Sequence, residues 1–205
     1  MIAIVDYGAG NLTSVLRAVV SLGHSAEITD DAGKIAAAER VIFPGVGAAG
    51  ETMANLKRLG LDRVLRQDVV DAGKPFLGIC IGVQVIFEWS DEDGGTPCLG
   101  LLPGRVVRFA GEGLKVPQIG WNQVRLRRPH PVFDGVSDGA EFYFVNSYHP
   151  RPADEGHVLA VTEYGAEFAS VVGRANLVAT QFHLEKSGRV GLKMLDNFCR
   201  WQGRA

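Results

Sequence analysis

The stretch Pro75-Phe76-Leu77-Gly78-Ile79-Cys80-Ile81-Gly82-Val83-Gln84 decides the fold of this chain. Its first half predicts a buried strand, and G-x-C-x-G is the cysteine version of the elbow that joins such a strand to a helix. The two flanking glycines leave room for a tight turn, while the N-terminus of the helix favours a thiolate. The N–H of Ile81 is then placed to donate to an oxyanion. A cysteine among apolar neighbours is otherwise a small core residue, and the glycines favour the nucleophile.

Short β-rich runs alternate with helical periodicity before this segment. Ile2 to Val5 predicts a buried strand, and Asn11 can cap a helix that Gly23 ends. The apolar face of this helix is expected to hold Leu12, Val15, Leu16, Val19 and Val20. Val41 to Phe43 predicts another central strand, which ends in Pro44-Gly45-Val46-Gly47. Such alternation is typical of a parallel sheet flanked by helices.

The second half of the chain changes character. Val106 to Phe109 and the alternation from Trp121 to Leu126 predict antiparallel strands with one wetted face. Further strands are expected at 142–145, 157–162, 168–172 and 177–182, and a closing helix carries Val190, Met194, Leu195, Phe198 and Trp201. The expected fold class is α/β: a single domain over residues 1–205, built as a sandwich with a mixed, mainly parallel central sheet flanked by helices.

Composition excludes several classes of protein. The 21 basic side chains are balanced by 23 acidic ones, which argues against a nucleic-acid binder. The longest apolar run, from Pro75 to Phe87, is shorter than the roughly 20 residues that cross a bilayer. The N-terminus lacks the cationic start of a signal peptide, and an odd number of distant cysteines suits a reducing compartment. A cytoplasmic location away from membranes is expected.

A thiol nucleophile requires a base, and histidine is the usual choice. His183 ends the β-rich run 177–182, and Glu185 follows two residues later. Strand alternation would place both side chains on one side, so that Glu185 orients the imidazole and the other ring nitrogen faces Cys80. The alternative for this pair is a solvated strand end. Among the other histidines, His24, His130 and His157 are read as surface or structural residues, whereas His149 stays a second candidate.

Together these motifs resemble those of a known family. The elbow, Phe182-His183-Leu184-Glu185 and Pro44-Gly45-Val46-Gly47 resemble class I glutamine amidotransferases, over nearly the whole chain. More narrowly, three segments resemble glutaminase subunits of imidazole glycerol phosphate synthase, an enzyme of histidine biosynthesis: Asp6-Tyr7-Gly8-Ala9-Gly10-Asn11-Leu12, Gly120-Trp121-Asn122 and Glu185-Lys186-Ser187.

The resemblance implies a reaction. Cys80 attacks the side-chain amide of L-glutamine, His183 shuttles protons, Glu185 orients His183, and water releases glutamate from the thioester. The implied oxyanion hole uses the backbone of Gly47 and Ile81. The residues implied to hold the substrate are Gln84, Asn146, Ser147 and Tyr148. Each is also an ordinary polar residue at a helix start or strand end. No metal and no cofactor is implied.

A partner chain is expected because the glutaminase elements leave no room for an acceptor domain, and free ammonia would be protonated and lost. The resemblance implies a heterodimer with a (β/α)₈ cyclase that makes imidazole glycerol phosphate and aminoimidazole carboxamide ribotide. The positions implied at the subunit contact are Trp121, Tyr143, Lys186 and Asn11. Without the resemblance, these residues read as sheet aromatics and solvated polar groups.

The chain departs from the family at three positions. Leu184 stands where proline is more common, so packing must fix the backbone of His183. Gln118 and Asn146 stand where histidine is common, and an amide cannot take up a proton near neutral pH. Two rival functions stay open, namely the glutaminase subunit of another class I amidotransferase, as in pyridoxal phosphate synthesis, and an inert glutamine-sensing scaffold.

Overall fold

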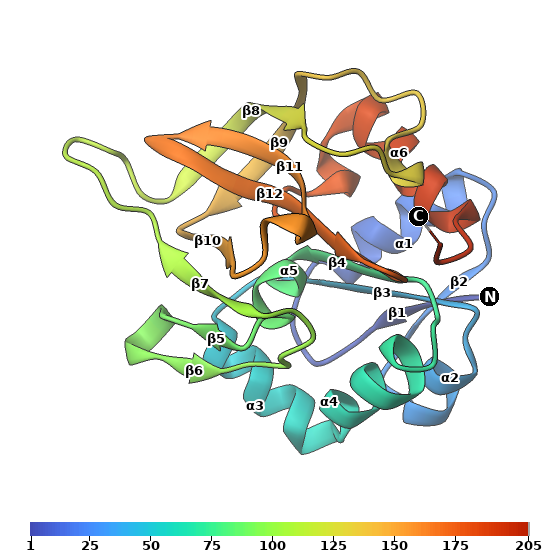
Figure 1. Cartoon of the computed structure of the whole chain (residues 1–205). Helices are drawn as coiled ribbons and strands as arrows, with labels where there is room; N and C mark the ends of the chain where they lie inside the picture. The colour runs from blue at the N-terminus through green and yellow to red at the C-terminus, as the bar shows by residue number, and fades with distance from the viewer. Residues whose placement is uncertain (205) are drawn as a thin grey trace.

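A nine-stranded mixed sheet forms the centre of the computed structural model, which describes residues 1–204 (Figure 1). Its strand order is β2-β1-β3-β4-β13-β12-β11-β8-β9. The strands are β1 (Ile2–Val5), β2 (Ala26–Thr29), β3 (Arg40–Gly45), β4 (Phe76–Cys80), β8 (Gln118–Leu126), β9 (Ala140–Asn146), β11 (Val158–Tyr164), β12 (Ala166–Arg174) and β13 (Leu177–Thr180). The pairings from β2 to β13 are parallel, and those from β13 to β9 are antiparallel. The α/β fold with a mixed sheet is as predicted.

Helices cover both faces of this sheet. The helices are α1 (Leu12–Ser21), α2 (Ala32–Ala37), α3 (Ala49–Leu59), α4 (Leu61–Arg63), α5 (Ile81–Val85) and α6 (Gly188–Arg200), with a π-helical turn over Val64–Val70. In Figure 1, α1 and α6 lie on one side of the parallel strands, and α2, α3 and α4 lie on the other. Alternate residues of β1 pack into two different hydrophobic cores. Ala3 and Val5 belong to one core, and Ile2 and Ile4 belong to the core on the other face. Burial on both faces explains the continuous apolar runs of the parallel strands.

A second, four-stranded sheet was not predicted from the sequence. Its order is β10-β7-β5-β6, with β10 (Tyr148–Pro152), β7 (Gly104–Arg108), β5 (Trp89–Ser90) and β6 (Thr96–Pro97). Two of these strands have only two residues, too few to produce a period-two pattern. This sheet follows α5 in the chain and contains β10, which begins directly after the Asn146-Ser147 segment.

Three local predictions need correction. Val20 does not lie on the buried face of α1: it is 53% exposed, and Ala18 is buried instead, because the 3.6-residue period turns Val20 away from Val15 and Val19. Asn11 occupies the N-cap position but makes no capping hydrogen bond with its side chain. The last strand ends at Thr180, before His183.

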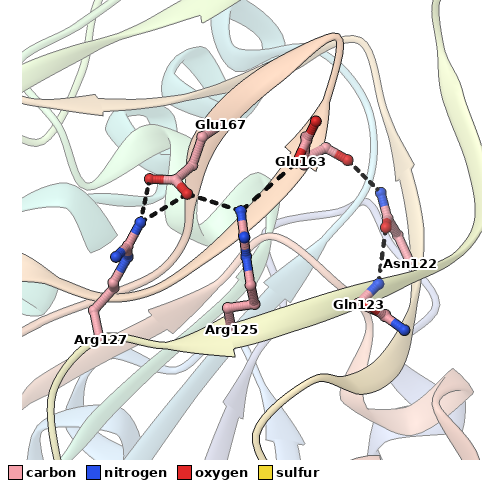
Figure 2. A network of polar contacts seen from close by, with 6 residues as sticks. All are labelled: Asn122, Gln123, Arg125, Arg127, Glu163 and Glu167. Carbon is pink, nitrogen blue, oxygen red and sulfur yellow. Dashed lines mark hydrogen bonds and ion pairs between the residues drawn. The ribbon is translucent and has the colours of Figure 1, made fainter.

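The antiparallel half has the wetted face that the alternation predicted. On it, Glu167 of β12 pairs with Arg125 at 2.9 Å and with Arg127 at 2.6 Å, and Asn122 donates to the backbone oxygen of Glu163 (Figure 2). These exposed pairs tie β8, β11 and β12 together, and each contributes at most about 1 kcal/mol. None of the helices within residues 1–204 is long and apolar enough to cross a membrane.

Candidate active site

Cys80 sits at a sharp bend between β4 and α5. Its φ of 55° and ψ of −105° are strained for a residue with a side chain, and it is 6% exposed. A Cβ at Gly82 would lie 2.1 Å from the carbonyl oxygen of Phe43, and one at Gly78 would lie 2.8 Å from the backbone of Gly82. Both glycines are therefore required by close backbone approach. The expected elbow is present.

His183 and Glu185 form a buried pair. Nδ1 of His183 lies 2.8 Å from Oε1 of Glu185, and the two side chains are 4% and 2% exposed. The structure thus brings the two residues together, but strand alternation is the wrong reason. Residues Leu184–Lys186 form a 3₁₀ turn, and this turn folds the carboxylate back onto the imidazole. The solvated strand end is excluded by the burial.

The surroundings of His183 favour its charged form. Burial alone would lower the pKa of His183, but polar contacts with Cys80 and Glu185 outweigh it and raise that pKa to about 9. Nε2 of His183 is buried, and within residues 1–204 it has no hydrogen-bond partner of ordinary geometry. The Cys80 thiol makes a 3.9 Å contact with the carbonyl oxygen of Val145. Nε2 is thus not committed to another group, and the polar contact with Cys80 places His183 beside the sulfur.

The backbone of His183 is held by β9 and by the start of α6. Its N–H donates to the Tyr143 oxygen at 3.0 Å. The Ser187 hydroxyl donates to the His183 carbonyl and accepts from the Tyr143 N–H at 3.0 Å. Leu184 is fully buried in the core on the α1 and α6 side of the sheet. Packing and hydrogen bonds thus hold the segment in which proline was expected.

A cavity of about 220 Å³ opens in front of Cys80. All the residues predicted for the oxyanion hole and for the substrate line it: Gly47, Ile81, Gln84, Asn146, Ser147 and Tyr148. Ile81 is the first residue of α5, and Gly47 has a φ of +106° just after β3. The cavity therefore joins three segments far apart in the sequence at the elbow.

Two buried amides border this site. Nε2 of Gln84 donates to the Tyr148 oxygen at 3.2 Å and to Oε1 of Gln181 at 3.3 Å, and Nδ2 of Asn146 donates to the Tyr148 oxygen at 2.9 Å. Oδ1 of Asn146 has no partner among the described residues. It is a buried acceptor without a protein partner, on a residue that lines the cavity.

Sequence reasoning missed Glu92. This residue lies in the polar loop Asp91-Glu92-Asp93, and its Oε2 accepts from the N–H of Ala49 at 2.7 Å. Burial raises the pKa of Glu92. Among the described residues that line the cavity, Glu92 is the one carboxylate. No motif marks it, because only tertiary folding brings this loop to the cavity. Val46, Pro117 and Val145 line the cavity as well.

The four residues expected at a subunit contact are all accessible. Trp121 and Tyr143 are paired opposite each other on β8 and β9, and their rings meet edge to face at 6.1 Å. Trp121 is 54% exposed, and Lys186 and Asn11 are exposed. The loop before Asn11 packs against the end of β3, where a Cβ on Gly10 would lie 3.2 Å from Gly45.

Within residues 1–204, no group of three His, Cys, Asp or Glu side chains is arranged to hold a metal.

Comparison with known proteins places this chain in a family. The family described as "Glutamine amidotransferase class-I" matches residues 3–201. The chain is 51% identical to an imidazole glycerol phosphate synthase subunit HisH of Dehalococcoides mccartyi, covering 97% of this chain and 96% of the relative. It is 52% identical to the subunit of the same name in Moorella thermoacetica, covering 96% and 93% of the two chains.

Solved structures agree at the level of the fold. PurLQS from Thermotoga maritima is 18% identical with a TM-score of 0.76, and 96% of each chain is covered. The glutaminase domain of Trypanosoma brucei CTPS, solved with bound acivicin, is 14% identical with a TM-score of 0.64, covering 100% of this chain and 97% of that one. From the family match over residues 3–201 and the relatives at about half identity, we conclude that the chain belongs to the class-I glutamine amidotransferase family.

Proposed function

We propose that this chain is the glutaminase subunit of an imidazole glycerol phosphate synthase. It hydrolyses L-glutamine at Cys80 and supplies the ammonia to a cyclase subunit. The observation that carries the proposal is that Cys80, which lines the cavity, makes a polar contact with His183 of the buried pair His183 and Glu185. The relatives named imidazole glycerol phosphate synthase subunit HisH support the choice of acceptor reaction.

Acylation begins at the sulfur of Cys80. An imidazolium beside the sulfur favours the thiolate, which attacks the side-chain carbonyl carbon of glutamine. His183 then gives its proton to the leaving nitrogen, so ammonia departs and the glutamyl thioester remains. Glu185 keeps Nδ1 of the ring occupied and stabilises the positive charge. Water activated by His183 attacks the thioester and releases glutamate.

Two backbone N–H groups are assigned to the tetrahedral intermediate. That of Ile81 lies at the positive end of α5, directly after the nucleophile, and that of Gly47 follows the end of β3. Removing one such donor typically costs about 10²–10³ in rate. Both residues line the cavity, which supports the assignment.

Glu92, the one carboxylate among the described residues that line the cavity, is assigned to the α-ammonium group of glutamine. Asn146 in the cavity wall is assigned to a polar contact with the substrate. Gln84 is committed to Tyr148 and Gln181 through its amide nitrogen. We assign it to shaping the cavity around the substrate.

The partner is a (β/α)₈ cyclase that forms a heterodimer with this chain. Trp121, Tyr143, Lys186 and Asn11 are assigned to the contact, because a large exposed aromatic beside the strand that holds His183 suits a binding hot spot. The complex acts in the cytoplasm, and the three cysteines, which are all free, are compatible with a reducing compartment. Neither a cofactor nor a metal is assigned to the reaction.

The test is Cys80→Ala, assayed for glutamate release with the cyclase and its ribotide substrate present. We expect hydrolysis to fall to background while ammonia-driven cyclisation by the complex continues. Cys98→Ala is the matched control, because burial raises the pKa of the Cys98 thiol to about 11 and it lies outside the cavity. Equal glutaminase rates in Cys80→Ala and wild type would reject the proposal. Glutaminase activity without any coupling to a cyclase would favour another class I amidotransferase.

A further inference from the structure

Tyr7 is buried beneath the end of β3, and the proposed mechanism does not use it. It follows β1, has no exposed surface, and its ring centroid lies 5.2 Å from that of Phe43. Its hydroxyl donates to the carbonyl oxygen of Val46 at 3.4 Å. A Cβ on Gly45 would lie 1.8 Å from this hydroxyl oxygen. Because Gly45 has no side chain, the Tyr7 hydroxyl has space to approach the Val46 carbonyl.

The bond to Val46 acts on the peptide that carries the Gly47 N–H. The carbonyl of Val46 and the N–H of Gly47 belong to one planar, trans peptide unit, so they point in opposite directions. The Val46 carbonyl points towards the buried Tyr7 hydroxyl, so the Gly47 N–H points away from it. Val46 and Gly47 are both accessible and line the cavity in front of Cys80. The hydroxyl is thus placed to set the direction of this N–H.

We infer that Tyr7 is a positioning residue whose hydroxyl fixes the Val46–Gly47 peptide so that the Gly47 N–H faces the oxyanion formed at Cys80. This inference rests on the proposed function, because it requires a tetrahedral intermediate at that sulfur. Tyr7 does not line the cavity, so the role that we assign to it acts through the backbone.

The hydroxyl is suited to this role over a wide range of pH. Burial raises the pKa of Tyr7 to about 12, although a hydrogen bond with Thr52 opposes this effect. The hydroxyl therefore keeps its proton and stays a donor wherever the enzyme operates. Gly47 has a φ of +106° and a Cβ there would meet nothing within 4 Å, so the space beside this residue is open. The hydroxyl of Tyr7 supplies a side-chain hydrogen bond to this peptide.

The expected effect is smaller than that of removing a donor. Without the hydroxyl the Gly47 N–H still exists, but its direction is less well defined. We expect Tyr7→Phe to lower kcat about tenfold, below the roughly 10²–10³ lost with a whole oxyanion donor. KM for glutamine should stay within about twofold, because the lost restraint acts on the transition state and not on ground-state binding.

The experiment compares Tyr7→Phe with Tyr164→Phe in the complex with cyclase and ribotide. Tyr164 also donates its hydroxyl to a backbone carbonyl, that of Lys115 at 2.7 Å, but it does not line the cavity. Steady-state kinetics are measured beside the rate at which iodoacetamide alkylates Cys80. Alkylation needs the thiolate but forms no oxyanion. We expect Tyr7→Phe to lose kcat with unchanged alkylation, and Tyr164→Phe to match wild type in both.

Two results would overturn the inference. One is a kcat of Tyr7→Phe equal to that of wild type. The other is a parallel loss of kcat and alkylation, which would show that the hydroxyl supports the elbow as a whole. Both variants are assayed below their thermal unfolding transitions, so that a loss of folding is not read as a loss of rate. If Cys80→Ala also retained full hydrolysis, the proposed function itself would fail, which is a distinguishable outcome.

Discussion

His183 and Tyr143 form an isolated antiparallel bridge, in which the N–H of His183 donates to the oxygen of Tyr143 at 3.0 Å. The imidazole assigned as the base is thus attached to β9 through its own backbone. The ring of Tyr143 on β9 contacts the exposed ring of Trp121 on the neighbouring strand β8. Tyr143 therefore connects the exposed Trp121 ring with the backbone of His183.

Ser187 is predicted to be needed to hold the base. Its hydroxyl bonds to the His183 carbonyl and receives the N–H of Tyr143. Ser187→Ala leaves both groups without this partner, so we expect the free energy of unfolding to fall by about 1–3 kcal/mol and the glutaminase rate to fall as well. Urea unfolding and steady-state kinetics measure the two effects. Ser21→Ala, which removes a hydroxyl bonded to Ala18 away from the site, should leave the rate unchanged.

The ionisation of His183 is predicted to depend on Cys80. Because contact with Cys80 helps to raise the pKa of His183 to about 9, Cys80→Ala should lower that pKa. NMR titration of the imidazole measures it directly. His130 serves as an internal control, since burial alone lowers its pKa to about 4 and the substitution should not change that value. An unchanged pKa for His183 would contradict the contact.

The same raised pKa predicts how stability changes with pH. A pKa that is higher in the folded state gives stabilisation that is fully present below the unfolded value of about 6.5 and is lost as pH rises through about 9. The difference in unfolding free energy between wild type and His183→Asn should therefore shrink between these two pH values. Urea titrations across this range test it. A difference that grows with pH would show that the neutral imidazole is the stabilised form.

Glu92 is predicted to contribute to glutamine affinity. Glu92→Gln keeps an oxygen that can accept from the Ala49 N–H but removes the negative charge from the cavity. We expect KM for glutamine to rise about tenfold or more, as loss of a charge-assisted contact implies, with a smaller effect on kcat. Glu88→Gln is the matched control, because Glu88 accepts from the Gly104 N–H outside this cavity. Equal KM values in the two variants would remove Glu92 from substrate binding.

Trp121 is predicted to be a hot spot for the cyclase. Trp121→Ala should weaken the complex by about 2 kcal/mol or more, as expected for an aromatic anchor. Isothermal titration against the cyclase gives the affinity. Trp89→Ala provides the comparison, because Trp89 is also partly exposed but lies on β5 in the second sheet. If both variants bind as tightly as wild type, the contact lies on another face.

The sequence by itself was sufficient for the parts of this protein that depend on local sterics and periodicity. The glycines at 78 and 82 predict the elbow at Cys80, because no other residue allows two backbone segments to approach each other so closely. The apolar runs at 2–5, 41–43 and 76–79 predict the parallel strands, because strands that are buried on both faces are apolar throughout. His183 and Glu185 are two residues apart, so their pairing could be foreseen, although a 3₁₀ turn and not a strand produces it.

Tertiary structure alone decided the rest. Glu92 lies in a polar loop that carries no motif, and only folding brings it to the cavity. The strands β5 and β6 have two residues each, too few to give a recognisable sequence pattern. Tyr7 and Val46 are 39 positions apart, and their hydrogen bond exists only once β1 and β3 are neighbours in the sheet. Such contacts depend on how distant segments pack, and the packing is set by the whole core. Local patterns therefore identified the residue that we propose as the nucleophile, and long-range packing determined what surrounds it.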